Sequence, residues 1–136
     1  MIRPIVREMM FLAQPSLPAC PGDETVFDDL LDTLRANQDR CVGLAANMIG
    51  VRKQVIAFMS GPFCIAMMNP EIVSRSGAYE TEEGCLSLDG IRKTIRYEKI
   101  EVVYQDRSFQ KKCTIYTGWI AQIIQHEIDH CNGILI

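Results

Sequence analysis

Both histidines of the chain fall within one six-residue stretch, Gln125-His126-Glu127-Ile128-Asp129-His130. Four residues is slightly more than one helical turn, so on a helix His126 and His130 share a face and can bind one metal ion. Glu127 lies about 100° around the helix from His126, where it can act on a metal-bound water without being a ligand. This H-E-x-x-H pattern is typical of metallohydrolases. The alternative, two solvated histidines on a surface helix, leaves the use of the whole histidine supply at this spacing unexplained.

The segment that carries the histidines is predicted to be a helix over 117–132. Apolar side chains recur along it at helical spacing, and Asn132-Gly133 supplies a stop signal. The apolar positions are Trp119, Ile120, Ile123, Ile124, Ile128 and Cys131. So broad an apolar face predicts a largely buried helix, and therefore a metal site with apolar surroundings.

The elements that must hold this helix are predicted to include a sheet. Segments rich in β-branched, aromatic and other apolar residues, at 54–59, 63–68, 100–104 and 112–116, are expected to be strands. A second helix is predicted over 23–37, with Asp23 as its N-cap and packing as its only role. Because no regular β-α alternation is present, we expect an α+β fold. Antiparallel or mixed sheets would pack around the C-terminal helix, with one N-terminal helix added.

Size and charge narrow the function further. At 136 residues, with 14 basic and 17 acidic side chains, residues 1–136 are expected to form a single domain that binds neither nucleic acid nor an anionic membrane surface. No apolar run is long enough for a signal-peptide core or a membrane helix, which predicts a cytoplasmic protein. The six cysteines include no C-x-x-C pair, so most are expected to be buried reduced thiols that pack as small apolar side chains.

Two histidines leave a catalytic tetrahedral metal one protein ligand short, because the fourth position is kept for water. A cysteine, aspartate or glutamate elsewhere in the chain can supply the third ligand. The most conspicuous candidate is Cys85, in the turn-like stretch Glu82-Glu-Gly-Cys-Leu-Ser-Leu88 between predicted strands.

With Cys85 as a third ligand beside the two histidines, the chain resembles the peptide deformylases. These enzymes remove the formyl group from the N-terminal formylmethionine of new proteins. Residues 43–50, Gly-Leu-Ala-Ala-Asn-Met-Ile-Gly, are similar to the first family motif, G-φ-G-φ-A-A-x-Q-φ-G, where φ is an apolar residue. Residues 83–87 match the second motif, E-G-C-L-S, and residues 125–130 match the third, Q-H-E-x-D-H. The chain ends at Ile136, where many members continue into a further helix, so the resemblance is to a short form.

The resemblance implies that Cys85, His126 and His130 bind one divalent metal ion, with Glu127 as the base that moves protons. The ion is usually Fe²⁺ in this family, although Zn²⁺, Ni²⁺ or Co²⁺ can occupy the site. Ligand type alone favours zinc, so the expectation of iron rests on the resemblance. The resemblance also implies the binding partners, which are formylated peptide N-termini at the ribosome.

The resemblance also implies how the peptide is held. Backbone groups of Val42, Gly43 and Gly84 would bind it as an added strand. Trp119 and Ile123 would line the pocket for the methionine side chain, although core packing explains these two residues equally well.

Around the ligands, the resemblance implies a set of supporting polar residues. Glu83 and Arg96 would form an ion pair that supports the cysteine loop; two solvated surface charges are the alternative. Gln125 or Asp129 would hydrogen-bond a ligand or a neighbouring loop.

The chain departs from the family pattern at two positions near the site. Met48 stands where the first motif has a glutamine, whose amide and the backbone N–H of Leu86 would stabilise the oxyanion. A thioether has no donor, and losing one oxyanion donor costs about 10²–10³ in turnover. Asn47 has an amide, but a shift of one residue usually points a side chain the other way. Asp89 replaces the proline that commonly follows L-S-φ.

These observations predict metal-dependent hydrolysis of N-terminal formyl groups, with release of formate. Met48 motivates one alternative, a deformylase-like protein that binds metal and peptide with little or no turnover. The other alternative is a metal amidohydrolase that acts on a different acyl group.

Overall fold

The computed structural model describes all 136 residues, and its five strands form one antiparallel sheet in the order of the chain. The elements are α1 (Met9–Leu12), α2 (Glu24–Ala36), β1 (Gly43–Ala45), the 3-10 helix η1 (Ala46–Ile49), β2 (Val55–Ser60), β3 (Phe63–Gly84), β4 (Ile91–Gln105), β5 (Lys111–Thr117) and α3 (Gly118–Cys131). This is the α+β fold that the sequence predicts, with a short additional helix at α1.

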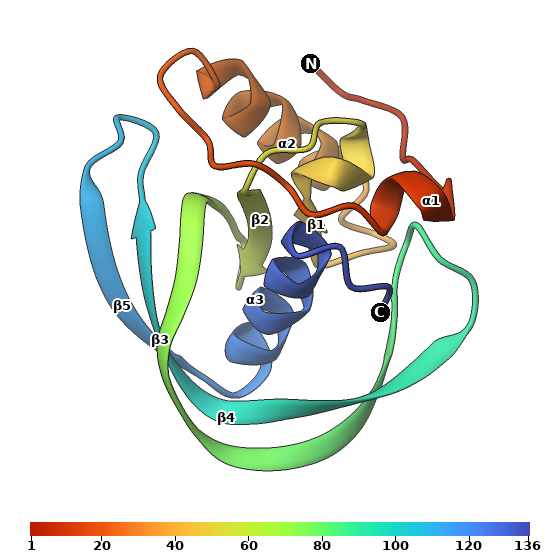
Figure 1. The fold of residues 1–136 in the computed structure, drawn as a ribbon, viewed down its shortest axis with the longest axis vertical. Helices are drawn as coiled ribbons and strands as arrows, with labels where there is room; N and C mark the ends of the chain where they lie inside the picture. Colours follow the sequence, from red (N-terminus) through yellow and green to blue (C-terminus); the bar gives the residue numbers. More distant parts are fainter.

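The long hairpin of β3 and β4 brings the predicted cysteine loop to the histidine helix. The two strands pair from Met68 opposite Gln105 to Gly84 opposite Ile91, with two register shifts near the start of the ladder. In Figure 1 this ribbon curves beneath α3, and the loop at its tip lies on the side of α1. A bulge increases the bend and twist of a strand, so the shifts help the ribbon to curve around the helix.

The helices close the other sides of the core. Leu30 and Leu34 of α2 and Ile124 of α3 are fully buried within a cluster of 24 buried apolar residues. Both helices pack against β2, whose first four residues are all buried. None of the helices is long and apolar enough to cross a membrane.

The predicted helices agree with the structure to within one residue at each end. The strands predicted at 54–59 and 112–116 match β2 and β5 to within one residue at each end, but the other two predicted strands are too short and β1 was not predicted. The prediction of 63–68 covers only the start of β3, and that of 100–104 only the end of β4. The middle of the hairpin is largely exposed and polar, so it lacks the apolar runs that identify strands. For the same reason Glu82–Gly84, expected in a turn, belong to β3. Asp23 is the N-cap of α2, but its side chain makes no capping hydrogen bond. The expectation that most cysteines are buried is wrong, since only Cys131 is buried.

We expect Leu30→Ala to lower the free energy of unfolding by about 2–5 kcal/mol, because it leaves a cavity in a fully buried part of the core. Urea unfolding followed by circular dichroism measures the change. Leu17→Ala is the matched control: Leu17 is 58% exposed, so its loss should cost less than about 0.5 kcal/mol. Equal losses for the two variants would contradict this packing.

Candidate active site

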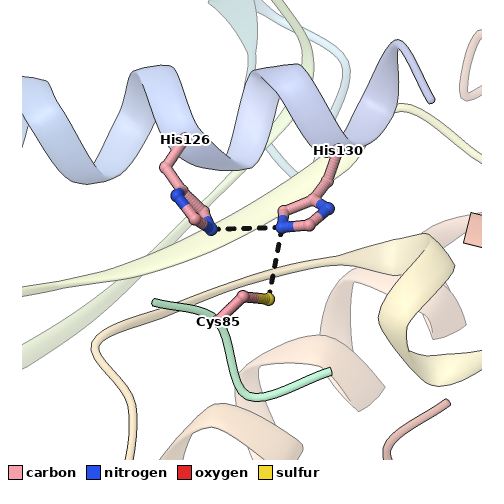
Figure 2. Close-up of side chains that lie close together, drawn as sticks. All are labelled: Cys85, His126 and His130. Atoms are coloured by element: carbon pink, nitrogen blue, oxygen red, sulfur yellow. Dashed lines mark hydrogen bonds between the residues drawn. The ribbon is translucent and has the colours of Figure 1, made fainter. Parts of the chain in front are cut away.

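Three metal-binding side chains from two distant parts of the chain converge at one point. Figure 2 shows His126 and His130 of α3 facing Cys85, the first residue after β3. The two imidazole Nε2 atoms lie 3.1 Å apart, and Cys85 Sγ lies 3.3 Å from His130 Nε2. All three ligand atoms are within 4.8 Å of one another.

These distances fit a tetrahedral metal ion. Around an ion with metal–nitrogen bonds of about 2.05 Å and a metal–sulfur bond of about 2.3 Å, two nitrogens lie roughly 3.3 Å apart and nitrogen and sulfur roughly 3.6 Å. The two observed distances, 3.1 Å between the nitrogens and 3.3 Å between Cys85 Sγ and His130 Nε2, are only slightly shorter. One thiolate and two imidazoles form a donor set that suits zinc, iron and similar ions, and three protein ligands leave the fourth position open.

His126 is oriented by a buried carboxylate. Its Nδ1 donates a hydrogen bond of 2.7 Å to Glu83 Oε1, which leaves Nε2 free to face the metal position. Burial opposes a charge on His126, but its contacts with Cys85 and Glu83 outweigh burial and raise its pKa to about 10, so metal binding must displace a proton from Nε2. The pKa of Glu83 falls to about 2, because hydrogen bonds from His126 and Arg96 outweigh the effect of burial.

The second histidine is held differently. His130 is fully buried, and its Nδ1 has no hydrogen-bond partner. Burial and the positive charge of His126 lower the pKa of His130 to about 3. A histidine must be neutral to bind a metal ion, so this environment favours the form that ligates.

Glu127 is buried beside the ligands. It is only 4% exposed, and its Oε1 has no hydrogen-bond partner. Burial raises the pKa of Glu127 to about 7, so the carboxylate can take up a proton and give it back near neutral pH. Gly43 is required next to it, because a Cβ there would lie 2.7 Å from Glu127 Oε2 and 2.8 Å from Ile123 Cγ2.

The two predicted oxyanion positions differ in what they offer. Leu86 follows Cys85 in the loop, and its backbone N–H donates to no group within the protein. The Met48 side chain is buried, and its sulfur accepts a hydrogen bond of 3.4 Å from the Ala45 N–H. Asn47 does not replace it, because its amide donates to the His130 carbonyl at 2.9 Å. A backbone donor is therefore present at one position and no donor at the other.

A cleft opens beside the three ligands. Four of the predicted substrate residues line it, namely Val42, Gly84, Trp119 and Ile123, together with Glu82, Glu83, Cys85, Gln122, His126 and Glu127. The fifth, Gly43, lies against Glu127 as described. Trp119 is 60% exposed, which argues against a purely core role, whereas Ile123 is buried.

Two residues of this region were not predicted from the sequence. Gln122 donates a hydrogen bond of 2.9 Å to Glu83 Oε2, and its position four residues before His126 was the available signal. Cys41 lines an adjoining cleft with Cys85 and Leu86. Burial, with the nearby charge of Glu127, raises the pKa of the Cys41 thiol to about 11.

The remaining predicted polar residues attach α3 to the sheet. Glu83 and Arg96 form a buried ion pair with hydrogen bonds of 2.7 and 2.9 Å. Arg96 also donates to Asp129 at 2.6 Å. Gln125 pairs with both backbone groups of Tyr97 at 2.8 Å, so it docks the helix on β4 and does not touch a ligand side chain.

Comparisons of the sequence with known proteins point to the deformylases. The polypeptide deformylase family profile matches residues 10–136. A peptide deformylase of Clostridium beijerinckii is 57% identical over 136 residues, the full length of both chains. Another, from Carboxydothermus hydrogenoformans, is 37% identical over 97% of this chain and 84% of its own.

Solved structures agree with these sequence relatives. A class I type b peptide deformylase from Acinetobacter baumannii, with Met-Ala-Ser bound, superposes with a TM-score of 0.88 at 28% identity, over 99% of this chain and 97% of that one. A peptide deformylase from Legionella pneumophila gives a TM-score of 0.87 at 36% identity, over 99% and 83% of the two chains. By its sequence, its fold and its Cys-His-His metal site, the chain belongs to the peptide deformylase family.

Proposed function

We propose that Cys85, His126 and His130 bind the catalytic metal ion of a peptide deformylase and that Glu127 is its base. The reaction is removal of the N-terminal formyl group from newly made peptides, with release of formate. The observation that carries the assignment is the convergence of the three ligand atoms within 4.8 Å beside a buried carboxylate. A protein that only bound metal and peptide would have no use for that carboxylate.

When bound, the metal ion would supply an activated water as nucleophile and would polarise the formyl carbonyl. Glu127 would accept a proton from the attacking water and pass it to the peptide nitrogen as the carbon–nitrogen bond breaks. The water oxygen ends on formate, and the peptide leaves with a free amino group. The absence of a partner on Glu127 Oε1 supports this role, because no other group competes for the proton.

The peptide would bind as an added strand at the free edge of β1. The Val42 carbonyl accepts a hydrogen bond of 2.8 Å from Met59 of β2. Because successive strand residues direct their backbone groups to opposite sides, Gly43 directs its own toward the free edge. Gly84 lies across the same cleft, next to Cys85. We therefore propose that Gly43 and Gly84 bind the backbone, while Trp119 and Ile123 contact the first side chain.

The developing oxyanion would be stabilised by the Leu86 N–H. This N–H has no partner within the protein and directly follows the ligand Cys85. Met48 cannot donate a hydrogen bond, so only the Leu86 N–H and the metal ion would stabilise the oxyanion. We further propose that residues 1–136 act as one deformylase domain in the cytoplasm, on formylated N-termini that emerge from the ribosome.

Glu127→Gln should lower kcat for formate release from a formyl-Met peptide by about 10²–10⁴, because the amide keeps the shape of the side chain but cannot take a proton. The bound-metal stoichiometry should stay at the wild-type value. Glu82→Gln is the matched control, since Glu82 lines the same cleft but is exposed, and its loss should be far smaller. Wild-type turnover by Glu127→Gln would exclude Glu127 as the base.

Met48→Gln should raise kcat, because it introduces an amide donor on the oxyanion side. The gain should approach but not exceed about 10²–10³, the usual effect of one oxyanion donor. Met48→Leu, which also lacks a donor, should show no gain. An unchanged kcat in Met48→Gln, with the metal site fully loaded, would mean that another group already stabilises the oxyanion.

We propose Fe²⁺ as the physiological ion, and expect protein purified without oxygen to contain one iron per chain. Chelation should abolish formate release, and adding Fe²⁺, Ni²⁺ or Co²⁺ should restore it. Cys85→Ser should weaken metal binding, because it removes the thiolate ligand. Elemental analysis alongside the formate assay measures both effects. Full activity in metal-stripped protein would contradict a metal mechanism.

A further inference from the structure

The loop Cys85–Gly90 carries a metal ligand and the proposed oxyanion donor, yet it has few hydrogen bonds of its own. Its only internal backbone hydrogen bond runs from the Leu88 N–H to the Cys85 carbonyl, at 3.3 Å. The Ser87 hydroxyl is buried without a partner. Asp89 stands where the resemblance predicts a proline, so the ring that would stiffen the backbone at this position is missing. Something outside the loop must therefore fix the Leu86 N–H.

The segment before α1 makes the contacts that the loop lacks. Arg7 Nη1 donates a hydrogen bond of 3.0 Å to the Leu86 carbonyl. Arg7 Nη2 donates to the Asp89 carboxylate, at the other end of the loop. A planar guanidinium can hold two acceptors in a fixed geometry, so one side chain links both positions. Arg92 adds a hydrogen bond of 3.1 Å to the Asp89 carbonyl.

The same segment also reaches the second oxyanion position. The Val6 N–H donates a hydrogen bond of 2.8 Å to the carbonyl of Met48. Two neighbouring residues, Val6 and Arg7, are thus bonded to Met48 and to Leu86, which lie 38 positions apart in the sequence. The segment is therefore hydrogen-bonded to both sides of the site.

We propose that Arg7 is a positioning residue for the deformylase reaction and that the Arg7–Asp89 pair takes the place of the proline. By holding the Leu86 carbonyl, Arg7 limits rotation of the residue whose N–H stabilises the oxyanion. Arg7 does not touch the substrate in this role. The inference rests on the proposed function, because it assigns Arg7 to the oxyanion side of that site.

The exposure of the Arg7–Asp89 pair distinguishes a positioning role of Arg7 from a contribution to the stability of the fold. The side chains of Arg7 and Asp89 are 53% and 93% exposed, and exposed ion pairs contribute little to the free energy of unfolding. Arg3, in the same segment, pairs instead with the buried Asp29 of α2 at 3.1 Å and does not contact the loop. Arg3→Ala is therefore a matched control, which removes an arginine contact of the segment but spares the loop.

The experiment compares Arg7→Ala with Arg3→Ala as metal-loaded proteins. For Arg7→Ala we expect kcat to fall about 5–20-fold, part of the effect of losing a whole oxyanion donor, while KM and the melting temperature stay near wild type. For Arg3→Ala we expect the opposite pattern, a lower melting temperature and the wild-type kcat. A kcat loss in Arg7→Ala that equals that of Arg3→Ala, or no loss, would overturn the proposal.

A second readout does not depend on turnover. Hydrogen exchange of the Leu88 amide, followed by NMR, should be several-fold faster in Arg7→Ala than in Arg3→Ala, because its bond to Cys85 reports the order of the loop. Equal exchange would overturn the proposal. Since exchange needs no substrate, a wild-type protein that releases no formate would refute the proposed function and leave this test intact.

Rescue provides the sharpest test. The Asp89 N–H makes no hydrogen bond, so a proline at this position removes none. Adding Asp89→Pro to Arg7→Ala should restore most of kcat, because the ring stiffens the backbone without the ion pair. Arg7→Lys should be intermediate, because one ammonium cannot reproduce the two-pronged contact. If Asp89→Pro does not raise kcat in the Arg7→Ala background, the Arg7–Asp89 pair does not take the place of the proline.

Discussion

The Glu83 carboxylate holds together the three elements on which the site depends. Its Oε1 accepts hydrogen bonds from His126 Nδ1 and Arg96 Nη2, both at 2.7 Å. Its Oε2 accepts from Arg96 Nε and Gln122 Nε2, both at 2.9 Å. These partners come from β4 and α3, while Glu83 itself is the penultimate residue of β3, only two residues before Cys85. The same group therefore fixes the orientation of one ligand and the approach of the loop that carries another.

Burying this charge is favourable only because all of its partners are present. Glu83 and Arg96 are 8% and 4% exposed, and removing one member of such a pair costs about 3–5 kcal/mol because the other charge stays buried. The hydrogen bonds of the network constrain the geometry, since a shift of β3 relative to α3 would break several of them together. Glu127 lies next to this network without joining it. It has burial but no compensating hydrogen bond on Oε1, which explains why its pKa rises to about 7 while that of Glu83 falls to about 2.

The sequence identified the parts of this arrangement that depend on local spacing. His126 and His130 are four residues apart on one helix, so their convergence follows from helical geometry alone. The approach of Cys85 depends on a curved hairpin whose exposed middle has no strand signal, so the sequence offered Cys85 only as a candidate for the third ligand and the resemblance selected it. Gln122 and Arg7 were missed because their roles arise from contacts across 39 and 79 positions. For Gln122 the helical spacing to His126 was the one local signal, whereas no local pattern indicates the contact of Arg7.

Two departures from the family pattern, at Met48 and Asp89, lie on the same side of the metal site. Met48 removes a side-chain donor and Asp89 removes a rigid backbone position, whereas the ligands and Glu127 are intact. An oxyanion site with a single protein donor depends more strongly on where that donor is placed, because no second hydrogen bond corrects a displacement. In this chain the N-terminal segment bonds to Met48 through Val6 and to Leu86 through Arg7. The hydrogen bonds of Val6 and Arg7 thus support the backbone on the side of the site where Met48 has removed a hydrogen-bond donor.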